Sequence, residues 1–336
     1  MFQSSTHPTA VVDDTALVAW NYGVYLQDEW RPIKKLTLDY GVRFDLYDGL
    51  TRSDQFSPRV AAIYQLFEGT ALHAGYARYF TPAPLDAVSG EDLVKFADTT
   101  NEPMVKTDTH IAPERAHYFD AGITQNLPHN VKVDLDSYYK KSTDLLDEGQ
   151  FGPTLVFTPF NYAKGRQYGV EFTTSMNPLK DLTFYSNFAY SVAQGIDIVS
   201  DQFLFSAPEL AFIKTHYVFL DHDQTFSQSA GITYTLRGFL FTLNDIYGSG
   251  LRSGFANTGN LPFYVQFDAG IVKPLTLTSV GKVEARAAVI NLGDWIYPIR
   301  SGSGIGVFAP QFGPRRSFYG GLKWYIPFFN RQGSIQ

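Results

Sequence analysis

The sequence predicts an all-β protein, an antiparallel β-barrel whose long strands cross a membrane. Three observations lead to this fold class. Apolar and polar residues alternate with a period of two along almost the whole chain of 336 residues, the alternating segments are unusually long, and the connections between them are alternately short and long. Successive side chains of a strand point to opposite faces, so this alternation is typical of a sheet with one apolar and one polar face.

The alternation is clearest in the stretch 36–47, where even positions are apolar or aromatic and most odd positions are charged, polar or glycine. About thirteen such segments of about 10 to 14 residues follow one another. Strands of soluble proteins usually have about five or six residues, whereas a tilted strand that crosses a bilayer needs about 9 to 11. The expected strands are 18–31, 36–48, 56–66, 70–80, 115–126, 130–142, 165–176, 181–193, 225–236, 239–249, 262–273, 281–293 and 315–327.

The connections alternate in length. Short turns are expected at 31–35, 67–69, 127–129, 177–180 and 237–238, and longer loops at 49–55, 81–114, 143–164, 194–224, 250–261 and 294–314. Outer-membrane barrels have short periplasmic turns and long external loops. A soluble β-sandwich, the alternative, would show no such regularity.

The two faces predict which side chains meet lipid and which meet water. Inside a bilayer every backbone polar group needs a partner, so such a sheet is expected to close. The polar face is expected to line a wet lumen with Asp39, Arg43, Asp45, Lys132, Asp134, Asp136, Glu171, Asn187, Gln266, Asp268, Glu284 and Arg286. Aromatic belts at the two lipid–water interfaces are expected from Trp20, Tyr22, Trp30, Tyr79, Tyr138, Tyr139, Tyr247, Trp324 and Tyr325.

Composition excludes several classes of protein. An apolar content of 44% excludes a disordered chain, and the sequence contains no apolar stretch long enough for a membrane-spanning helix. The absence of cysteine excludes disulfide scaffolds and thiolate metal sites. A net charge of −6 argues against a nucleic-acid partner, which normally meets a basic face.

No motif predicts an enzyme, a cofactor or a metal site. Asp134 and Asp136 share one face of a strand, and solvated lumen charges balanced by Lys132 and Arg286 explain them better than acid–base catalysis. The segment 221–223 (Asp-His-Asp) could hold a metal but falls in an expected external loop. The glycine-rich segment 302–306 lacks the lysine of a phosphate-binding loop.

Six motifs resemble the barrel domain of TonB-dependent outer-membrane receptors, and they occur in the family's order over nearly the whole chain. Each motif alone is weak, but together they are specific. They are the hairpin 22–30 and 36–45; 56–60; Pro113-Glu114 with Tyr118 and Gly122; Asn161, Gly165 and Gly169-Val170-Glu171; Asn291-Leu292-Gly293-Asp294 with Tyr297; and 313–316 with 318–322.

The resemblance implies a barrel of about 22 strands filled by an N-terminal plug, preceded by a signal peptide and a TonB-contacting segment. Residues 1–7 have no signal-peptide pattern, and thirteen strands is an odd number. The chain is therefore expected to be truncated, lacking the plug and about nine strands. Residues 1–17 would be the remainder of an external loop, 18–328 the barrel strands and 329–336 a C-terminal tail that extends past the aromatic final strand.

The resemblance also implies the function. The intact protein would lie in the outer membrane of a Gram-negative bacterium, contact outer-membrane lipid, and take up a large scarce solute (a siderophore, corrinoid or glycan) with energy from the TonB complex, which contacts the missing plug region. The external loops are rich in aromatic residues, which either bind this solute or pack the loops together, and no ligand-binding residue is assigned. A passive outer-membrane porin is the alternative function.

Overall fold

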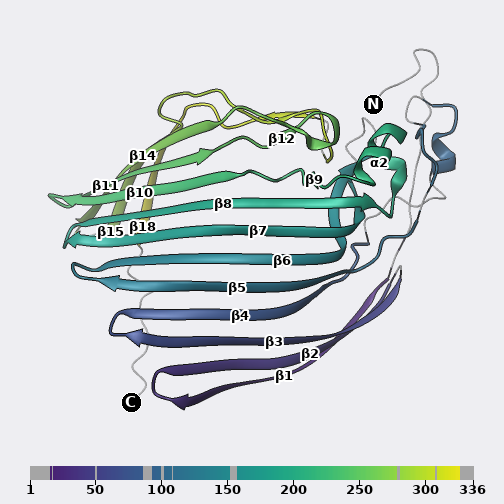
Figure 1. Ribbon diagram of the computed structural model, residues 1–336. Helices are drawn as coiled ribbons and strands as arrows, with labels where there is room; N and C mark the ends of the chain where they lie inside the picture. Colours follow the sequence, from purple (N-terminus) through teal and green to yellow (C-terminus); the bar gives the residue numbers. More distant parts are fainter. Residues whose placement is uncertain are drawn as a thin grey trace.

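The computed structural model describes residues 16, 18–49, 51–85, 93–99, 102–107, 109–151, 157–277, 281–306 and 309–325, most of which form one large antiparallel sheet (Figure 1). Its thirteen long strands are hydrogen-bonded in chain order. They are β1 (Trp20–Ile33), β2 (Leu36–Asp48), β3 (Arg52–Phe67), β4 (Thr70–Thr81), β5 (Glu114–Leu127), β6 (Val131–Gln150), β7 (Phe157–Leu179), β8 (Leu182–Ile198), β10 (Phe226–Leu236), β11 (Phe239–Gly248), β14 (Tyr264–Leu277), β15 (Gly281–Ile290) and β18 (Ser317–Tyr325).

Each predicted strand coincides with one of these strands, so the predicted fold class is confirmed. The main correction concerns 143–164, predicted as a loop, because β6 and β7 extend to 20 and 23 residues and pair as far as Gln150 and Phe157. In this extension Phe160, Asn161 and Tyr162 are all buried, although they are consecutive. Protein covers both faces there, so the alternation that marks a strand in lipid is lost.

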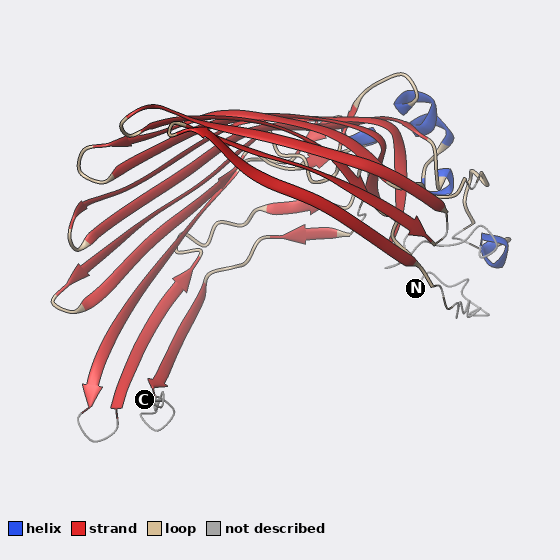
Figure 2. Cartoon of the chain, turned by 90° about the horizontal axis from the view of Figure 1, so that it is seen from below, coloured by secondary structure: helices blue, strands red, loops and turns tan. Residues whose placement is uncertain are grey.

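The sheet curves into an open trough (Figure 2). Among the described residues β1 pairs only with β2, and β18 only with β15, so the two outermost strands each leave one edge unpaired. No helix in the described part has the length and apolar character needed to span a bilayer. The domain boundaries predicted at 1–17 and 329–336 fall almost entirely outside the described residues.

The two ends of the trough differ as predicted. One end carries tight turns, such as Arg237-Gly238, where both residues have positive φ, as a two-residue type I′ hairpin requires. The other end carries the long connections (Figure 1). These contain short elements: η1 (Val94–Phe96), η2 (Gln202–Leu204), α2 (Ala207–Ile213), β9 (Val218–Phe219), β12 (Arg252–Ser253), η3 (Phe255–Asn257), β13 (Gly259–Asn260), β16 (Pro298–Ser301) and β17 (Pro310–Phe312).

The strand register separates two faces. Followed across the sheet, the paired positions place all twelve predicted lumen residues on one face, which we call the inner wall. The opposite, outer face carries mainly apolar and aromatic side chains. The aromatic-belt prediction was partly wrong. Six of the nine residues lie on the outer face, but Tyr79, Tyr138 and Tyr325 lie on the inner wall.

The long connections pack into a cap at their end of the trough, which the sequence predicts to be the external end. Its largest apolar cluster joins the extended β6–β7 hairpin to α2 and to the segments around β9, η3 and β16, through Leu145, Phe160, Tyr162, Ile198, Phe205, Ile213, Val218, Ala256 and Ile305. Phe151 and Phe203 form a second cluster with Leu93. For these aromatic residues loop packing explains the composition, whereas Phe157, Trp295 and Phe312 stay exposed.

Buried ion pairs tie the cap together. Arg252 on β12 donates to the Asp223 carboxylate at 2.6 Å, and both side chains are more than nine-tenths buried. The same guanidinium lies 3.5 Å from the centre of the Phe219 ring. Arg300 on β16 bonds the Asp221 carboxylate, and so fixes the 294–314 segment over the 218–224 segment.

We expect the two faces to respond oppositely to a new charge. Phe172 and Thr173 are neighbours on β7 and lie on opposite faces. Arginine on the lipid-facing side near the membrane midplane costs about 2–4 kcal/mol, whereas arginine in the lumen stays hydrated. Phe172→Arg should therefore lower the free energy of unfolding of the complete receptor in lipid vesicles by at least about 2 kcal/mol. Equal losses for Phe172→Arg and Thr173→Arg would contradict the face assignment.

We also expect the cap to depend on its buried ion pair. Arg252→Met leaves the Asp223 carboxylate buried without its counter-charge, a change that costs about 3–5 kcal/mol. Amide hydrogen exchange in 218–225 and 250–261 should accelerate by at least about 100-fold. Arg315→Met is the matched control, because Arg315 bonds Asp294 at an exposed position. Similar exchange in both variants would show that the buried pair does not hold the cap.

Candidate functional site

Three tyrosines form a row on the inner wall near its external end. Tyr79, Tyr118 and Tyr138 come from the adjacent strands β4, β5 and β6, and we call them the tyrosine row. The rings of Tyr79 and Tyr118 meet edge-on with centroids 5.9 Å apart, and those of Tyr118 and Tyr138 are stacked at 6.3 Å. The row therefore presents a continuous aromatic surface with hydroxyl groups inside a polar trough.

A glycine beside the row allows this arrangement. Gly169 on β7 is paired with Tyr138, and a Cβ atom at Gly169 would lie 2.8 Å from the Tyr138 ring. A side chain there would push the ring away from the wall. The concave face of a curved sheet has less room per residue than the convex face, and alternating small and large side chains fits that taper.

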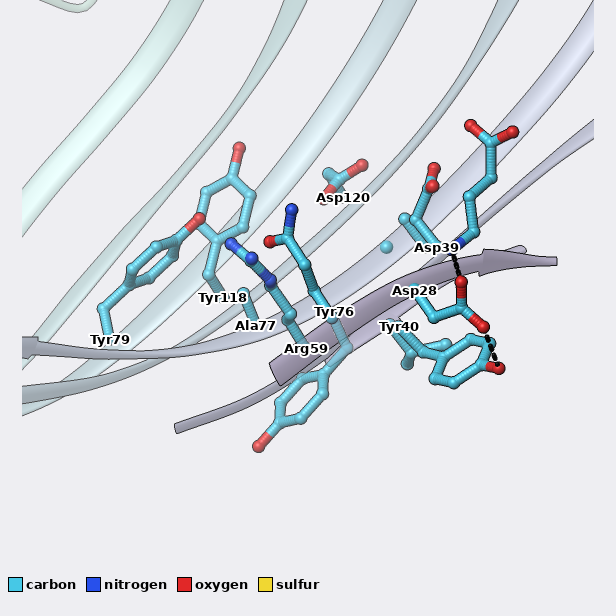
Figure 3. A pocket seen from close by; sticks show the side chains of 14 residues that line it. Asp28, Asp39, Tyr40, Arg59, Tyr76, Ala77, Tyr79, Tyr118 and Asp120 are labelled. Carbon is cyan, nitrogen blue, oxygen red and sulfur yellow. Dashed lines mark hydrogen bonds between the residues drawn. The ribbon is translucent and has the colours of Figure 1, made fainter. Parts of the chain in front are cut away.

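A hollow of about 610 Å³ lies on one side of the row (Figure 3). Tyr79 and Tyr118 line it with the carboxylates of Glu29, Asp39 and Asp120 from the inner wall, and with Arg59 as the single arginine or lysine in the lining. Figure 3 shows Tyr79, Tyr118, Arg59 and Asp120 on one side of the strands. The hollow is acidic, so it favours neutral or cationic groups over anions.

A second hollow, of about 410 Å³, lies beyond Tyr138 and beneath the cap. Its lining includes Gln167 and Tyr264 from the wall, and His222 and Asp223 from the cap. Burial raises the pKa of Asp223, against the opposing effects of the Ala193 N–H and of Arg252. The tyrosine row thus lies between two polar hollows.

The predicted carboxylate pair has structural partners. Asp134 lies 3.1 Å from the Lys132 ammonium and accepts from the Thr124 hydroxyl at 2.5 Å. Asp136 lies 2.9 Å from Nε2 of His73, which the sequence prediction did not include. The proposed balance by Lys132 is confirmed for Asp134, but Arg286 lies on β15 and pairs with Glu284 instead.

The other two candidate segments, 221–223 and 302–306, pack within the cap. Asp221 and Asp223 bond arginines, and His222 Nε2 lies 2.6 Å from Arg300. Within the part of the chain that the structure describes, no group of three acidic, histidine or cysteine side chains could hold a metal ion. In the 302–306 segment Gly304 and Gly306 have positive φ and lie against other residues of the cap, Asn257 and Asp221.

The family-motif residues hold the loops. Asn161 is fully buried and donates to the Ala112 and Asp144 carbonyls at 3.0 and 2.7 Å. Glu114 accepts from the Ser142 hydroxyl at 2.8 Å and lies 2.7 Å from the Lys140 ammonium.

The closing motif works in the same way at the other side of the sheet. Asn291 donates to the Trp295 and Pro314 carbonyls at 2.9 and 2.8 Å. Two hydrogen bonds from Arg315, and one from the Arg316 N–H, hold the pKa of Asp294 well below its usual range. These motif residues therefore position the loops and the final strand.

Sequence reasoning missed the tyrosine row because it grouped aromatic residues by their distance from strand ends. A signal was present. Tyr79 has the same parity as His73 and Gly75 along its strand, and Tyr138 the same parity as Asp134 and Asp136. Parity with charged residues and glycines places both rings on the wet face.

Comparisons with known proteins agree on one family. A family model described as TonB dependent receptor-like, beta-barrel, matches residues 3–292. The TonB-dependent transporter Oar of Myxococcus xanthus is 35% identical over 105 residues, which cover 27% of this chain and 10% of that protein.

Solved structures share the fold at low identity. The copper transporter OprC aligns with a TM-score of 0.66 and 15% identity, over 92% of this chain and 48% of its own. The siderophore receptor PiuA from Acinetobacter baumannii aligns with a TM-score of 0.64 and 16% identity, over 91% of this chain and 43% of its own. The iron transporter FrpB from Neisseria meningitidis, in its F3-3 variant, aligns with a TM-score of 0.63 and 16% identity, over 91% of this chain and 46% of its own. This chain spans less than half the length of these relatives. It belongs to the β-barrel family of TonB-dependent receptors.

Proposed function

We propose that this chain forms part of the wall of an outer-membrane receptor that takes up a large solute with energy from TonB. Receptors of this family are Gram-negative outer-membrane proteins, which agrees with the apolar outer face and the polar inner wall. The observation that carries the proposal is the tyrosine row between two hollows at the external end of the trough. A solute entering from outside would meet this surface on its path.

The chemistry of the row favours a neutral glycan among the three solute classes. Sugar rings have flat apolar faces that stack on aromatic rings, and hydroxyl groups that bond polar side chains. On the inner wall the first hollow holds three carboxylates and one guanidinium, so it repels anionic ferric chelates. The related structures are named for iron, copper and siderophore transport. At 15–16% identity these neighbours support the fold only. The solute class is therefore inferred from the residues of this chain.

Transport by this mechanism involves binding and gated passage without covalent chemistry. The plug that contacts TonB would occupy the trough in front of the inner wall. A passive porin, the alternative, needs a closed sheet with an even number of strands. The thirteen long strands described here form an open sheet, which favours a share in a larger barrel.

We expect truncation of the row to weaken solute binding. Tyr118→Ala in the complete receptor should weaken binding of maltoheptaose about three- to tenfold, because one aromatic contact contributes about 0.5–1.5 kcal/mol. Tyr118→Phe keeps the ring and should bind nearly as tightly as the unaltered receptor. Isothermal titration calorimetry in detergent would measure these affinities, with cyanocobalamin and a ferric tris-catecholate as competing probes.

Tyr139→Ala is the matched control, because Tyr139 lies next to Tyr138 in sequence and on the outer face. It should leave maltoheptaose affinity unchanged. Tight binding of the ferric tris-catecholate with no response to Tyr118→Ala would contradict both the glycan assignment and the role of the row.

A further inference from the structure

Four basic side chains lie side by side on the outer face where the strands reach their external ends. Arg78 on β4 is paired with His117 on β5, His117 with Lys141 on β6, and Lys141 with Arg166 on β7. We call these four residues the basic row. Arg115 and Lys164 lie two positions further out on β5 and β7 and face the same way.

An aromatic row lies directly below, two positions closer to the membrane centre. The register pairs Tyr76, Phe119, Tyr139 and Tyr168 in the same strand order. Tyr76 and Phe119 have centroids 5.1 Å apart, and Tyr139 and Tyr168 are stacked at 6.5 Å. Aromatic girdles of this kind mark the lipid–water interface of a barrel.

The basic row lies at the height of the outer-leaflet headgroups. Along β6, ten residues separate Val131, at the short-turn end, from Lys141. At about 3.3 Å per residue and a tilt of about 40°, this distance spans about 25 Å of membrane thickness, the height of the apolar band of such barrels. Between them the outer face of β6 carries Val133, Leu135, Ser137 and Tyr139.

The charges of the row are not compensated within the protein. None of the four makes an ion pair with a carboxylate among the described residues. Lys141 has no hydrogen-bond partner there, and Nε of the Arg78 guanidinium is buried without one. His117 shares a hydrogen bond with the Tyr76 hydroxyl, 2.9 Å from Nδ1. Arg166 donates to the Gln194 amide at 2.9 Å and lies under the Tyr217 ring.

Such an arrangement is unfavourable without an anion. Lys141 and Arg166 are like charges directly opposite each other, which destabilises a sheet, and lipid below the row offers no counter-charge. The carboxylate of Asp144 interacts with Arg115, which lies two positions further out than the row.

We propose that the basic row binds the phosphate groups of lipid A, the lipid anchor of lipopolysaccharide, in the outer leaflet. Guanidinium and ammonium groups bind phosphate oxygens through charge-assisted hydrogen bonds. The apolar and aromatic surface below the row accommodates the acyl chains of the same lipid. The basic groups of the row match the phosphates of lipid A, and the height of the row matches the outer-leaflet headgroups. Neither feature depends on which solute the receptor transports.

The test compares lipid binding to the complete receptor and to a variant that lacks two charges. Lys141→Gln with Arg166→Gln should weaken binding of bisphosphorylated lipid A in mixed micelles by at least tenfold, because each basic group near an anionic lipid surface contributes about fivefold. Dephosphorylated lipid A should bind weakly, and equally, to both proteins. The matched control is Lys34→Gln with Lys35→Gln, which removes two charges from the turn at the opposite end of the sheet, and it should leave binding unchanged.

Several outcomes would overturn the proposal. They are an equal loss of lipid A binding in both double variants, no loss of binding in Lys141→Gln with Arg166→Gln, and inorganic phosphate competing as effectively as lipid A. Heat-dependent mobility in gel electrophoresis checks that the barrel folds. Lys141→Gln alone, with an expected loss of about fivefold, keeps the test decisive if the double variant misfolds, and Lys141→Arg with Arg166→Lys should retain binding.

Discussion

The structure depends on one constraint, the hydrogen bonding of the peptide backbone in a medium without water. In lipid each N–H and C=O group needs a partner from a neighbouring strand. The thirteen long strands meet this need by pairing strictly in chain order, with tight turns at one end. The outer edges of β1 and β18 have no partner among the described residues, which fits part of a larger barrel.

Two different surfaces follow from the pairing. Since side chains alternate, the register that satisfies the backbone also sorts residues into a lipid face and a wet face. On the wet face, glycines such as Gly169 leave room for the rings of the tyrosine row. On the outer face, the same pairing lines up residues far apart in sequence, such as Arg78 and Arg166, in one row across the sheet. The tyrosine row and the basic row are thus consequences of one register.

Outside the membrane the constraint relaxes and the packing changes. The extended β6–β7 hairpin has protein on both faces, and its residues bury into an apolar cluster. Buried polar groups there are satisfied by specific partners, as for Asn161 between the Ala112 and Asp144 carbonyls. The family motifs mark these loop-holding positions, so they identify the family without identifying the solute.

The sequence by itself determined the existence and order of the long strands, the order of short and long connections, and the polar face. Period two and strand length are local properties, and lipid enforces them at every position. It also determined the family, through motifs spread along the chain. Only the tertiary structure decided that residues 143–164 are mostly strand, that Tyr79 and Tyr138 face the trough, and that Arg78, His117, Lys141 and Arg166 form one row. These features depend on which residue of one strand meets which residue of the next, and that register is set by contacts across the sheet rather than along the chain.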